Sequence, residues 1–357
     1  MKILFLPNWH VYNLDQDNMS IQAPDKYVKG DKYWFFKYFP ENTEVDIIDI
    51  KKKNILHKIE VIIKFYIWQA ILAFFKSNKY DVVISHGAQS GLLYALLSSF
   101  RKKNPLHVII DIGGLNGARG SRFQIALISY ALRRKPEIII HSSKQISLYH
   151  KMYNWLSDKV TFIPFGIDFE YFAKNNEHNQ DLSNYLLSFG RAKRDYDTLI
   201  ESWKNIHSDF TLKIIGKELD KHEVSMINSK GKVSLNELMD NIKSAYAVIV
   251  PLPIFNYSYG QMTFLQSMAM GKVVIVTETV SSVDYLTDAP GAILVKPYSR
   301  KDLTNAINLI IKLGSTKIKE MGIENQQYIK DNFHEKIMAE QIHNLINQKI
   351  NGYLYTI

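Results

Sequence analysis

Residues 247–276 of this 357-residue chain read AVIVPLPIFNYSYGQMTFLQSMAMGKVVIV, and this stretch predicts the fold. Two β-branched apolar runs, Ala247–Val250 and Val273–Val276, flank a segment whose apolar residues recur at three- and four-residue spacing, Gln261–Met270. Gly271 follows that segment, where a left-handed residue commonly ends a helix. The order strand, loop, helix, strand is the repeating unit of a parallel α/β sheet.

Short apolar runs of the same kind recur along the chain, with helix-length segments between most of them. Runs that are apolar on both faces and alternate with helices predict parallel sheets in a doubly wound α/β fold, and two series predict two sheets. The predicted strands are Ile3–Leu6, Val45–Ile48, Val82–Ser85, Val108–Ile112, Ile138–His141 and Val160–Ile163 in the first half, and Tyr185–Phe189, Leu212–Ile215, Ala247–Val250, Val273–Val276 and Ile293–Val295 in the second.

The length of the chain and its content of apolar residues suit two globular domains. An Asn-, Asp- and Glu-rich gap leads us to place a linker at 169–184 between a first domain, 1–168, and a second, 185–335. The last helical pattern falls within a C-terminal segment, 336–357. The absence of cysteine excludes disulfides, thiolate zinc sites and a Cys nucleophile, and no apolar run reaches the roughly 18–20 residues of a membrane span. We therefore expect a soluble or peripheral protein.

The net charge of +9 is unevenly placed. Residues 1–170 hold 23 Lys and Arg against 15 Asp and Glu, whereas 171–357 hold 21 against 20. The basic half predicts an acidic partner, either nucleic acid or an anionic membrane. Residues 51–79 combine lysines with Phe65, Trp68 and Phe75, which fits two structures. One is an amphipathic helix on an anionic membrane, and the other is a core helix with a solvated basic end.

Two loops of the second half predict an anion site. The amides of Gln261, Met262 and Thr263 would open a helix after Gly260 and present donors at its positive end, which suits a diphosphate. An ordinary strand–turn–helix that holds only water is the alternative. The second loop, Gly190–Tyr196, follows a predicted strand, and both loops fall at the carboxyl edge of a parallel sheet, where ligands bind.

The Gly190–Tyr196 loop carries three cations, Arg191, Lys193 and Arg194. Arg clamps phosphate oxygens through paired hydrogen bonds, and Lys adds a point charge. Alternatively, these cations pair with neighbouring aspartates on the surface. The chain has neither the Gly-x-Gly-x-x-Gly of simple dinucleotide enzymes nor a P-loop motif.

Three motifs together resemble the group 1 glycosyltransferases, family 4 and relatives, over roughly residues 160–300. They are Phe162-Ile-Pro-Phe-Gly-Ile-Asp-Phe-Glu-Tyr-Phe172, Gly190-Arg191 followed by Asp197-Thr-Leu-Ile-Glu-Ser-Trp203, and Phe264-Leu-Gln-Ser-Met-Ala-Met-Gly-Lys-Val-Val274. The resemblance implies two Rossmann-like domains that face a cleft, the GT-B fold, with the C-terminal helix crossing back to the first domain. It also implies a nucleotide sugar in the second domain and an acceptor in the first.

The same resemblance assigns roles to residues. It implies that Arg191 with Lys193 or Arg194 binds the donor diphosphate, together with the helix start from Gly260 to Thr263. It implies a UDP-linked sugar as substrate, no separate cofactor and no metal, although Asp15-Gln-Asp17 and Asp195-Tyr-Asp197 mimic a metal motif by letter. Family members usually carry two glutamates across this loop and helix. Ser258 and Gln266 stand at those positions here, so we expect them at the donor sugar and ribose.

An inverting transfer would need a base near the acceptor hydroxyl. Asp111 ends a predicted strand before Gly113-Gly114 and is one candidate; a turn-capping Asp is the alternative. His86 ends another predicted strand and is the second candidate; a partly buried strand-end His is its alternative. The stretch Gly113–Gly120 suits a mobile acceptor loop.

We therefore predict a cytoplasmic glycosyltransferase, peripheral on the inner face of the membrane, that builds an envelope polysaccharide or modifies a lipid-linked acceptor. Two alternatives stay open. A nucleotide-sugar epimerase on the same fold would need no external acceptor. A nucleic-acid-binding protein would use the basic half, but the chain carries no recognisable nucleic-acid-binding module, so we expect no nucleic-acid partner.

Overall fold

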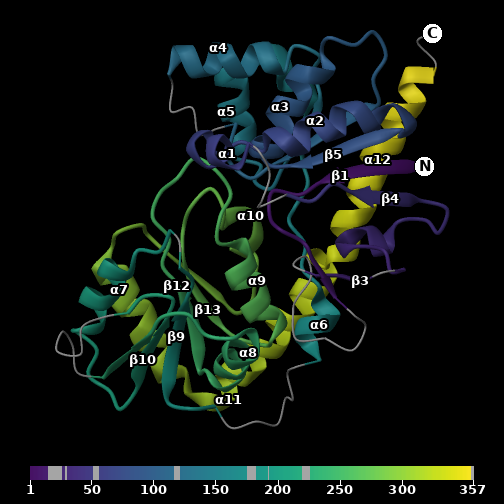
Figure 1. The fold of residues 1–357 in the computed structure, drawn as a ribbon. Coiled ribbons are helices and arrows are strands. Elements are labelled where there is room, and N and C mark those ends of the chain that lie inside the picture. The colour runs from purple at the N-terminus through teal and green to yellow at the C-terminus, as the bar shows by residue number, and fades with distance from the viewer. Residues whose placement is uncertain are drawn as a thin grey trace. The chain divides into compact units, whose positions relative to one another are not determined.

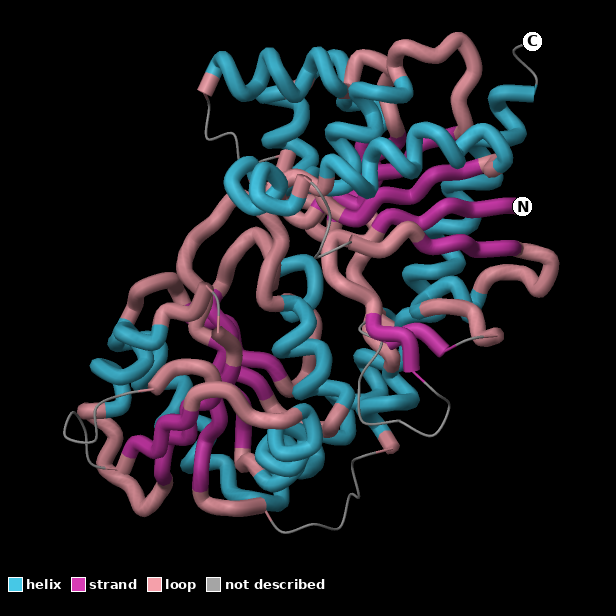
Figure 2. Tube along the Cα trace, in the orientation of Figure 1, coloured by secondary structure: helices cyan, strands magenta, loops and turns pink. Residues whose placement is uncertain are grey.

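The computed structural model describes residues 1–14, 26–28, 30–50, 56–115, 121–174, 182–191, 193–218 and 226–354. The chain forms two compact α/β units, as the sequence predicted (Figures 1 and 2). Unit 1 comprises Met1–Pro164, Asn256–Ser258 and Lys336–Ile357, and unit 2 comprises Phe165–Phe255 and Tyr259–Glu335. Three features of the sequence analysis lie outside the described residues: Asp15-Gln-Asp17, Lys51–Lys53 and the loop 116–120.

Unit 1 contains a parallel six-stranded sheet with the order β4-β1-β5-β6-β7-β8. In this sheet β4 lies on one side of β1, and β5 to β8 follow one another on its other side. The topological switch point therefore lies between β1 and β5. The strands are β1 (Lys2–Leu6), β4 (Glu44–Ile47), β5 (Val82–His86), β6 (Leu106–Asp111), β7 (Glu137–Ile140) and β8 (Val160–Phe162), beside a two-stranded ladder of β2 (Tyr12–Leu14) and β3 (Lys26–Val28).

Unit 1 has two apolar cores, in which the helices between Ile67 and Met152 pack against this sheet. The helices of the unit follow in chain order. They are α1 (His57–Ile63), α2 (Ile67–Lys76), α3 (Ala88–Ser98), α4 (Arg122–Ala131), α5 (Gln145–Met152) and α12 (Glu335–Leu354), with 3-10 turns at Trp34–Tyr38, Ser77–Lys79 and Asn154–Lys159. Helix α12 returns from the end of the chain to unit 1, as predicted. The carboxylate of Glu137 in β7 is almost fully buried and holds α12 through the ammonium of Lys349, 3.0 Å away.

Unit 2 repeats this architecture with the order β11-β10-β9-β12-β13-β14, again all parallel. Its switch point lies between β9 and β12. Its strands are β9 (Tyr185–Phe189), β10 (Thr211–Ile215), β11 (Ile227–Lys230), β12 (Ala247–Val250), β13 (Val274–Thr277) and β14 (Ala292–Val295), and its helices are α6 (Phe169–Ala173), α7 (Tyr196–Trp203), α8 (Leu235–Ser244), α9 (Gln261–Ala269), α10 (Val283–Leu286) and α11 (Arg300–Asn332).

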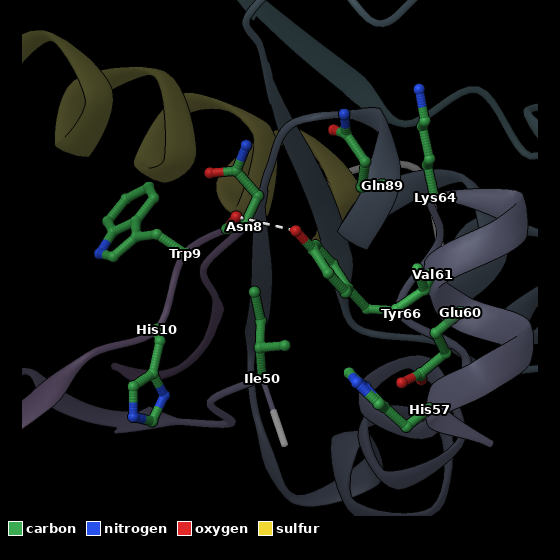
Figure 3. A pocket seen from close by; sticks show the side chains of 10 residues that line it. All are labelled: Asn8, Trp9, His10, Ile50, His57, Glu60, Val61, Lys64, Tyr66 and Gln89. Carbon is green, nitrogen blue, oxygen red and sulfur yellow. Dashed lines mark hydrogen bonds between the residues drawn. The ribbon is translucent and has the colours of Figure 1, made fainter. Parts of the chain in front are cut away.

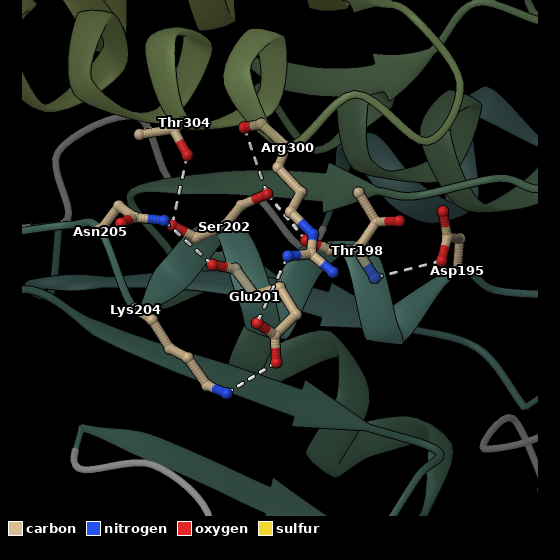
Figure 4. Close-up of polar contacts among 8 residues, drawn as sticks. All are labelled: Asp195, Thr198, Glu201, Ser202, Lys204, Asn205, Arg300 and Thr304. Atoms are coloured by element: carbon tan, nitrogen blue, oxygen red, sulfur yellow. Dashed lines mark hydrogen bonds and ion pairs between the residues drawn. The ribbon is translucent and has the colours of Figure 1, made fainter.

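Helix α7 is fixed to α11 by polar contacts as well as by the core of unit 2 (Figure 4). The hydroxyl of Ser202 donates to the carbonyl of Arg300 at 3.3 Å, and the hydroxyl of Thr304 donates to the carbonyl of Ser202 at 3.3 Å. At the other end of α7, the carboxylate of Asp195 accepts a hydrogen bond from the amide of Thr198 at 3.2 Å. The loop that enters α7 is therefore anchored where the helix begins.

Every predicted strand forms, with ends that shift by one or two residues at most. The sequence analysis missed the edge strand β11 and the β2–β3 ladder. The change from unit 1 to unit 2 falls between Pro164 and Phe165, ahead of the predicted linker 169–184. Within that range, Phe169–Ala173 forms α6 because Phe169 and Phe172 are buried, and 175–181 lies outside the described residues.

Candidate active site

Two loops meet at the carboxyl edge of the unit 2 sheet. The loop after β9 runs from Gly190 to Asp195, and the loop after β12 runs from Pro251 to Gly260. The amide of Asp195 donates to the carbonyl of Pro251 at 3.0 Å and ties them together. This is the switch point of the sheet, where open α/β folds bind ligands. The structure thus brings the predicted cation loop and the start of α9 to one place.

The first turn of α9 presents main-chain donors. Gly260 precedes it with φ of 82°, and a Cβ there would lie 2.9 Å from the side chain of Leu252, so glycine is required on both counts. The amide of Thr263 donates to the carbonyl of Gly260 at 3.0 Å. For the amides of Gln261 and Met262, the described part of the chain provides no acceptor. These amides stand at the positive end of the helix dipole.

Arg194 reaches this helix start. Its Nη2 donates to the hydroxyl of Thr263 at 2.6 Å, its Nε to the carbonyl of Phe189 at 3.2 Å and its Nη1 to the carbonyl of Lys193 at 3.1 Å. The guanidinium lies against Gly190, where an added Cβ would be 2.7 Å from it. Burial lowers the pKa of Arg194, but an Arg side chain stays charged at neutral pH. A half-buried cation is therefore held at the N-terminus of α9.

The other two predicted cations take different positions. Lys193 has a left-handed backbone, φ 56°, and its ammonium lies 5.5 Å from the ring centre of Phe255 and 5.8 Å from that of Tyr259, both in the loop before α9. Arg191 is exposed, and its Cγ lies 3.2 Å from where Gly216 would carry a Cβ, at the end of β10. Lys193 thus faces the α9 side of β9, whereas Arg191 lies on the β10 side.

The two residues predicted at the donor sugar belong to different units. Gln266 is buried in α9, one helical turn after Met262. Ser258 belongs to the three residues that group with unit 1, and its hydroxyl donates to the side-chain oxygen of Gln145 at 2.7 Å. Only Gln266 therefore lies in the same unit as the α9 donors.

Both aspartates of Asp195-Tyr-Asp197 make contacts within unit 2. Asp195 caps α7, and Asp197 pairs with the ammonium of Lys217 at 2.9 Å. Among the residues that the structure describes, no group of three or more His, Asp or Glu side chains could hold a metal ion. Over the same residues, no helix is long and apolar enough to cross a bilayer.

His86 lies at the switch point of unit 1. Its Nδ1 is 3.0 Å from the side-chain oxygen of Asn8, which follows β1, and the Trp9 ring packs edge-on at 4.7 Å between centres. Burial, with a smaller contribution from His141, lowers the pKa of His86 to about 3. The imidazole is thus neutral at pH 7, and when Nδ1–H donates to Asn8 the lone pair of Nε2 is an acceptor.

Asp111 has both carboxylate oxygens engaged and is fully buried. One oxygen accepts from the amides of Gly113 at 3.1 Å and Leu115 at 3.2 Å, and the other accepts from the hydroxyl of Tyr149 at 2.7 Å. Burial raises its pKa, while these bonds act in the opposite direction. The geometry favours the turn-capping alternative for Asp111.

A pocket of about 480 Å³ opens beside Asn8 and Trp9, at the β1–β5 switch point (Figure 3). The hydroxyl of Tyr66 donates to the carbonyl of Asn8 across it at 3.1 Å. The sequence analysis missed this pocket, although Asn8, Trp9 and His10 follow the first strand directly at its carboxyl edge. The lining residues are Asn8, Trp9, His10, Ile50, His57, Glu60, Val61, Lys64, Tyr66 and Gln89.

Comparison with known proteins agrees with this architecture. Residues 183–312 match the model of the family described as glycosyl transferases group 1. Among solved structures, a sucrose-phosphate synthase from Thermosynechococcus elongatus gives a TM-score of 0.66 at 14% identity, covering 99% of this chain and 100% of that one. HepE from Anabaena in complex with UDP gives 0.66 at 14%, covering 98% and 100%. The lipopolysaccharide outer core galactosyltransferase WaaB gives 0.62 at 15%, covering 98% and 100%.

No curated protein sequence matches the chain at a significant level. Two Rossmann-like units with these structural neighbours define a GT-B glycosyltransferase fold. The family match spans Arg194 and α9 and falls mostly in unit 2. The group 1 glycosyltransferase family thus matches residues 183–312 of the chain, and the solved structures show that the whole chain has the GT-B fold.

Proposed function

We propose that this enzyme transfers a sugar from a UDP-linked donor, bound by unit 2, to a saccharide or lipid-linked acceptor of the cell envelope, bound by unit 1. The observation that carries the proposal is the contact of Arg194 with Thr263 at the open N-terminus of α9. HepE, a structural neighbour, has been solved with UDP and with UDP-glucose, which supports a UDP-linked donor.

The donor diphosphate is the leaving group, so negative charge grows on it as the bond to the sugar breaks. Fixed donors aimed at that charge give the largest electrostatic contribution to catalysis. In our proposal the amides of Gln261 and Met262 and the guanidinium of Arg194 bind the diphosphate, and Lys193 and Arg191 add charge from the loop. This charge stabilises the leaving group without a metal ion. Gln266 hydrogen-bonds the ribose through its amide.

For the acceptor, we assign His86 the role of accepting a hydrogen bond from the reacting hydroxyl through Nε2. A pKa of about 3 keeps the ring neutral but makes it a weak base, so orientation of the hydroxyl is its main contribution. Asp111 stays the second candidate for a base in an inverting reaction. Ser258, whose hydroxyl donates to the side chain of Gln145, has no direct role toward the donor sugar in this proposal.

We further propose that the enzyme works at the cytoplasmic face of an anionic membrane. Of the predicted surface 51–79, helix α2 packs Ala70 and Ala73 into the core of unit 1, which fits the core-helix alternative. Helix α1, in contrast, exposes its apolar side chains beside Lys58 and Lys64, which fits the membrane alternative. The family match favours sugar transfer over the epimerase and nucleic-acid-binding alternatives.

A thermal-shift panel of UDP-, GDP- and other nucleotide sugars tests the donor assignment. A ligand that binds only the folded protein raises its melting temperature, so we expect UDP-sugars to stabilise the enzyme and uridine to have little effect. Transfer of a radiolabelled sugar from the best donor to envelope lipid extracts then tests the reaction. No stabilisation by any nucleotide sugar would contradict the proposal.

A further inference from the structure

Helix α1 buries a charged side chain and exposes its apolar ones, which is the reverse of the usual arrangement in a surface helix. Its buried side chain is Glu60, 7% exposed, whose carboxylate accepts a hydrogen bond from the amide of Trp68 at 2.7 Å. Its apolar side chains point to solvent, with Ile62 78% and Val61 61% exposed. Several large apolar side chains exposed on one short helix are a feature of interaction sites.

Helix α4 shows a second apolar stripe. Phe123, Leu127 and Tyr130 follow one another at four- and three-residue spacing, which places them on one face of the helix, and Phe123 is 77% exposed. The opposite face packs Ile125 and Ile128 against the core. The helix is therefore apolar on two faces, of which the core covers one.

An apolar groove of about 510 Å³ connects these surfaces. Such a volume falls within the range of about 300–1,000 Å³ typical of ligand pockets. The groove shares Lys64 and Gln89 with the pocket of Figure 3, so the two cavities meet at these residues. Its walls come from α3, α4 and the end of α1, with Leu92, Leu96, Leu127 and Ile128 among the apolar side chains that line it.

The charges beside the groove are positive. Lys58, Lys64 and Arg122 are exposed on α1, at its end and on α4. Helices α3 and α4 contain no acidic residue, and the single carboxylate of α1 is the buried Glu60. A molecule with a hydrocarbon chain for the groove and an anionic group for Lys64 would complement both features.

We propose that the acceptor is a lipid phosphate that carries a saccharide: its hydrocarbon chain lies in the α3–α4 groove, its phosphate contacts Lys64, and the saccharide hydroxyl that receives the sugar lies in the pocket beside Asn8. This inference rests on the proposed function and names the acceptor class. It explains why the pocket of Figure 3 adjoins an apolar groove, and why the exposed faces of α1 and α4 flank that groove. The exposed side chains contact the bilayer from which the lipid is drawn.

Titration of hexyl, octyl and decyl phosphate into the full-length enzyme, below their micelle concentrations, tests the groove. Each methylene buried in an apolar site contributes about 0.8 kcal/mol, which is roughly a fourfold change in Kd. We therefore expect decyl phosphate to bind on the order of 15-fold more tightly than octyl phosphate. Leu127→Asp should weaken decyl phosphate at least tenfold, and Lys64→Gln should weaken the phosphate but not decanol.

Leu309→Asp is the matched control, because Leu309 is a comparably exposed apolar residue of α11 in unit 2. It should leave alkyl phosphate binding unchanged. A Kd that does not depend on chain length, or equal effects of Leu127→Asp and Leu309→Asp, would overturn the proposal. So would Leu127-dependent sedimentation with phosphatidylglycerol vesicles without binding of soluble alkyl phosphates, since that result means membrane docking alone. UDP binding, measured in parallel, reports separately on the proposed function.

Discussion

Arg194→Ala should reduce kcat/KM for the nucleotide sugar by roughly 10- to 150-fold. The estimate follows from the loss of one charge-assisted hydrogen bond to phosphate, about 1.5–3 kcal/mol, expressed in the transition state where the diphosphate gains charge. Arg194→Lys should recover part of this loss, because an ammonium restores the charge but not the planar fork of donors. Steady-state kinetics with a saturating acceptor, and calorimetric titration of UDP, give the two readouts.

Two controls separate binding from folding. The guanidinium also bonds the carbonyls of Phe189 and Lys193, so thermal unfolding of the variant must be measured beside its kinetics. Lys204→Ala removes another unit 2 cation, at the far end of α7 from the site, where it pairs with Glu201, and should change neither readout. If the folded Arg194→Ala enzyme keeps kcat/KM and UDP affinity within about twofold of wild type, the diphosphate is not bound where we place it.

Three further predictions concern the rest of the chain. Burial lowers the pKa of His86 and His107 to about 3 and that of His141 to about 4, so these histidines bind protons more readily in the unfolded chain than in the folded chain. The free energy of unfolding should therefore fall below pH 6.5, by up to about 1.4 kcal/mol per pH unit for each histidine. Urea titrations at pH 7, 6 and 5 check this, and a free energy of unfolding that does not change with pH would contradict it. Asn325→Ala should lower the free energy of unfolding of unit 2, measured in urea, by more than about 2 kcal/mol, because the buried side chain makes three hydrogen bonds to main-chain groups. A decrease below about 0.5 kcal/mol would show that those main-chain groups find other partners. Asp111→Asn should cost about 1–3 kcal/mol of stability while the folded enzyme keeps its activity; complete loss of transfer by folded protein would instead identify Asp111 as the base.

The fold was predictable because buried parallel strands are apolar on both faces and alternate with helices. Runs such as Ala247–Val250 therefore stand out in the sequence, and each forms a strand. The edge strand β11, Ile227–Lys230, escaped because its sequence INSK is largely polar and its side chains alternate between half-buried and exposed. An edge strand of this kind carries little hydrophobic signal.

The candidate site was predictable in its elements but not in its contacts. Gly260 and the start of α9 follow from local sequence, and so does the loop of three cations. Which cation reaches α9 depends on the left-handed backbone of Lys193 and on the space left by Gly190, which only the folded chain specifies. The buried carboxylate of Glu60 likewise reverses the expected polarity of α1.

The central claim is that the start of α9 and the cation beside it bind one pyrophosphate, and a crystal structure of the enzyme with UDP tests it most directly. We predict pyrophosphate oxygens within about 3 Å of the amides of Gln261 or Met262 and of the Arg194 guanidinium. Density for the pyrophosphate at another edge of unit 2, with these amides bonded only to water, would contradict the account.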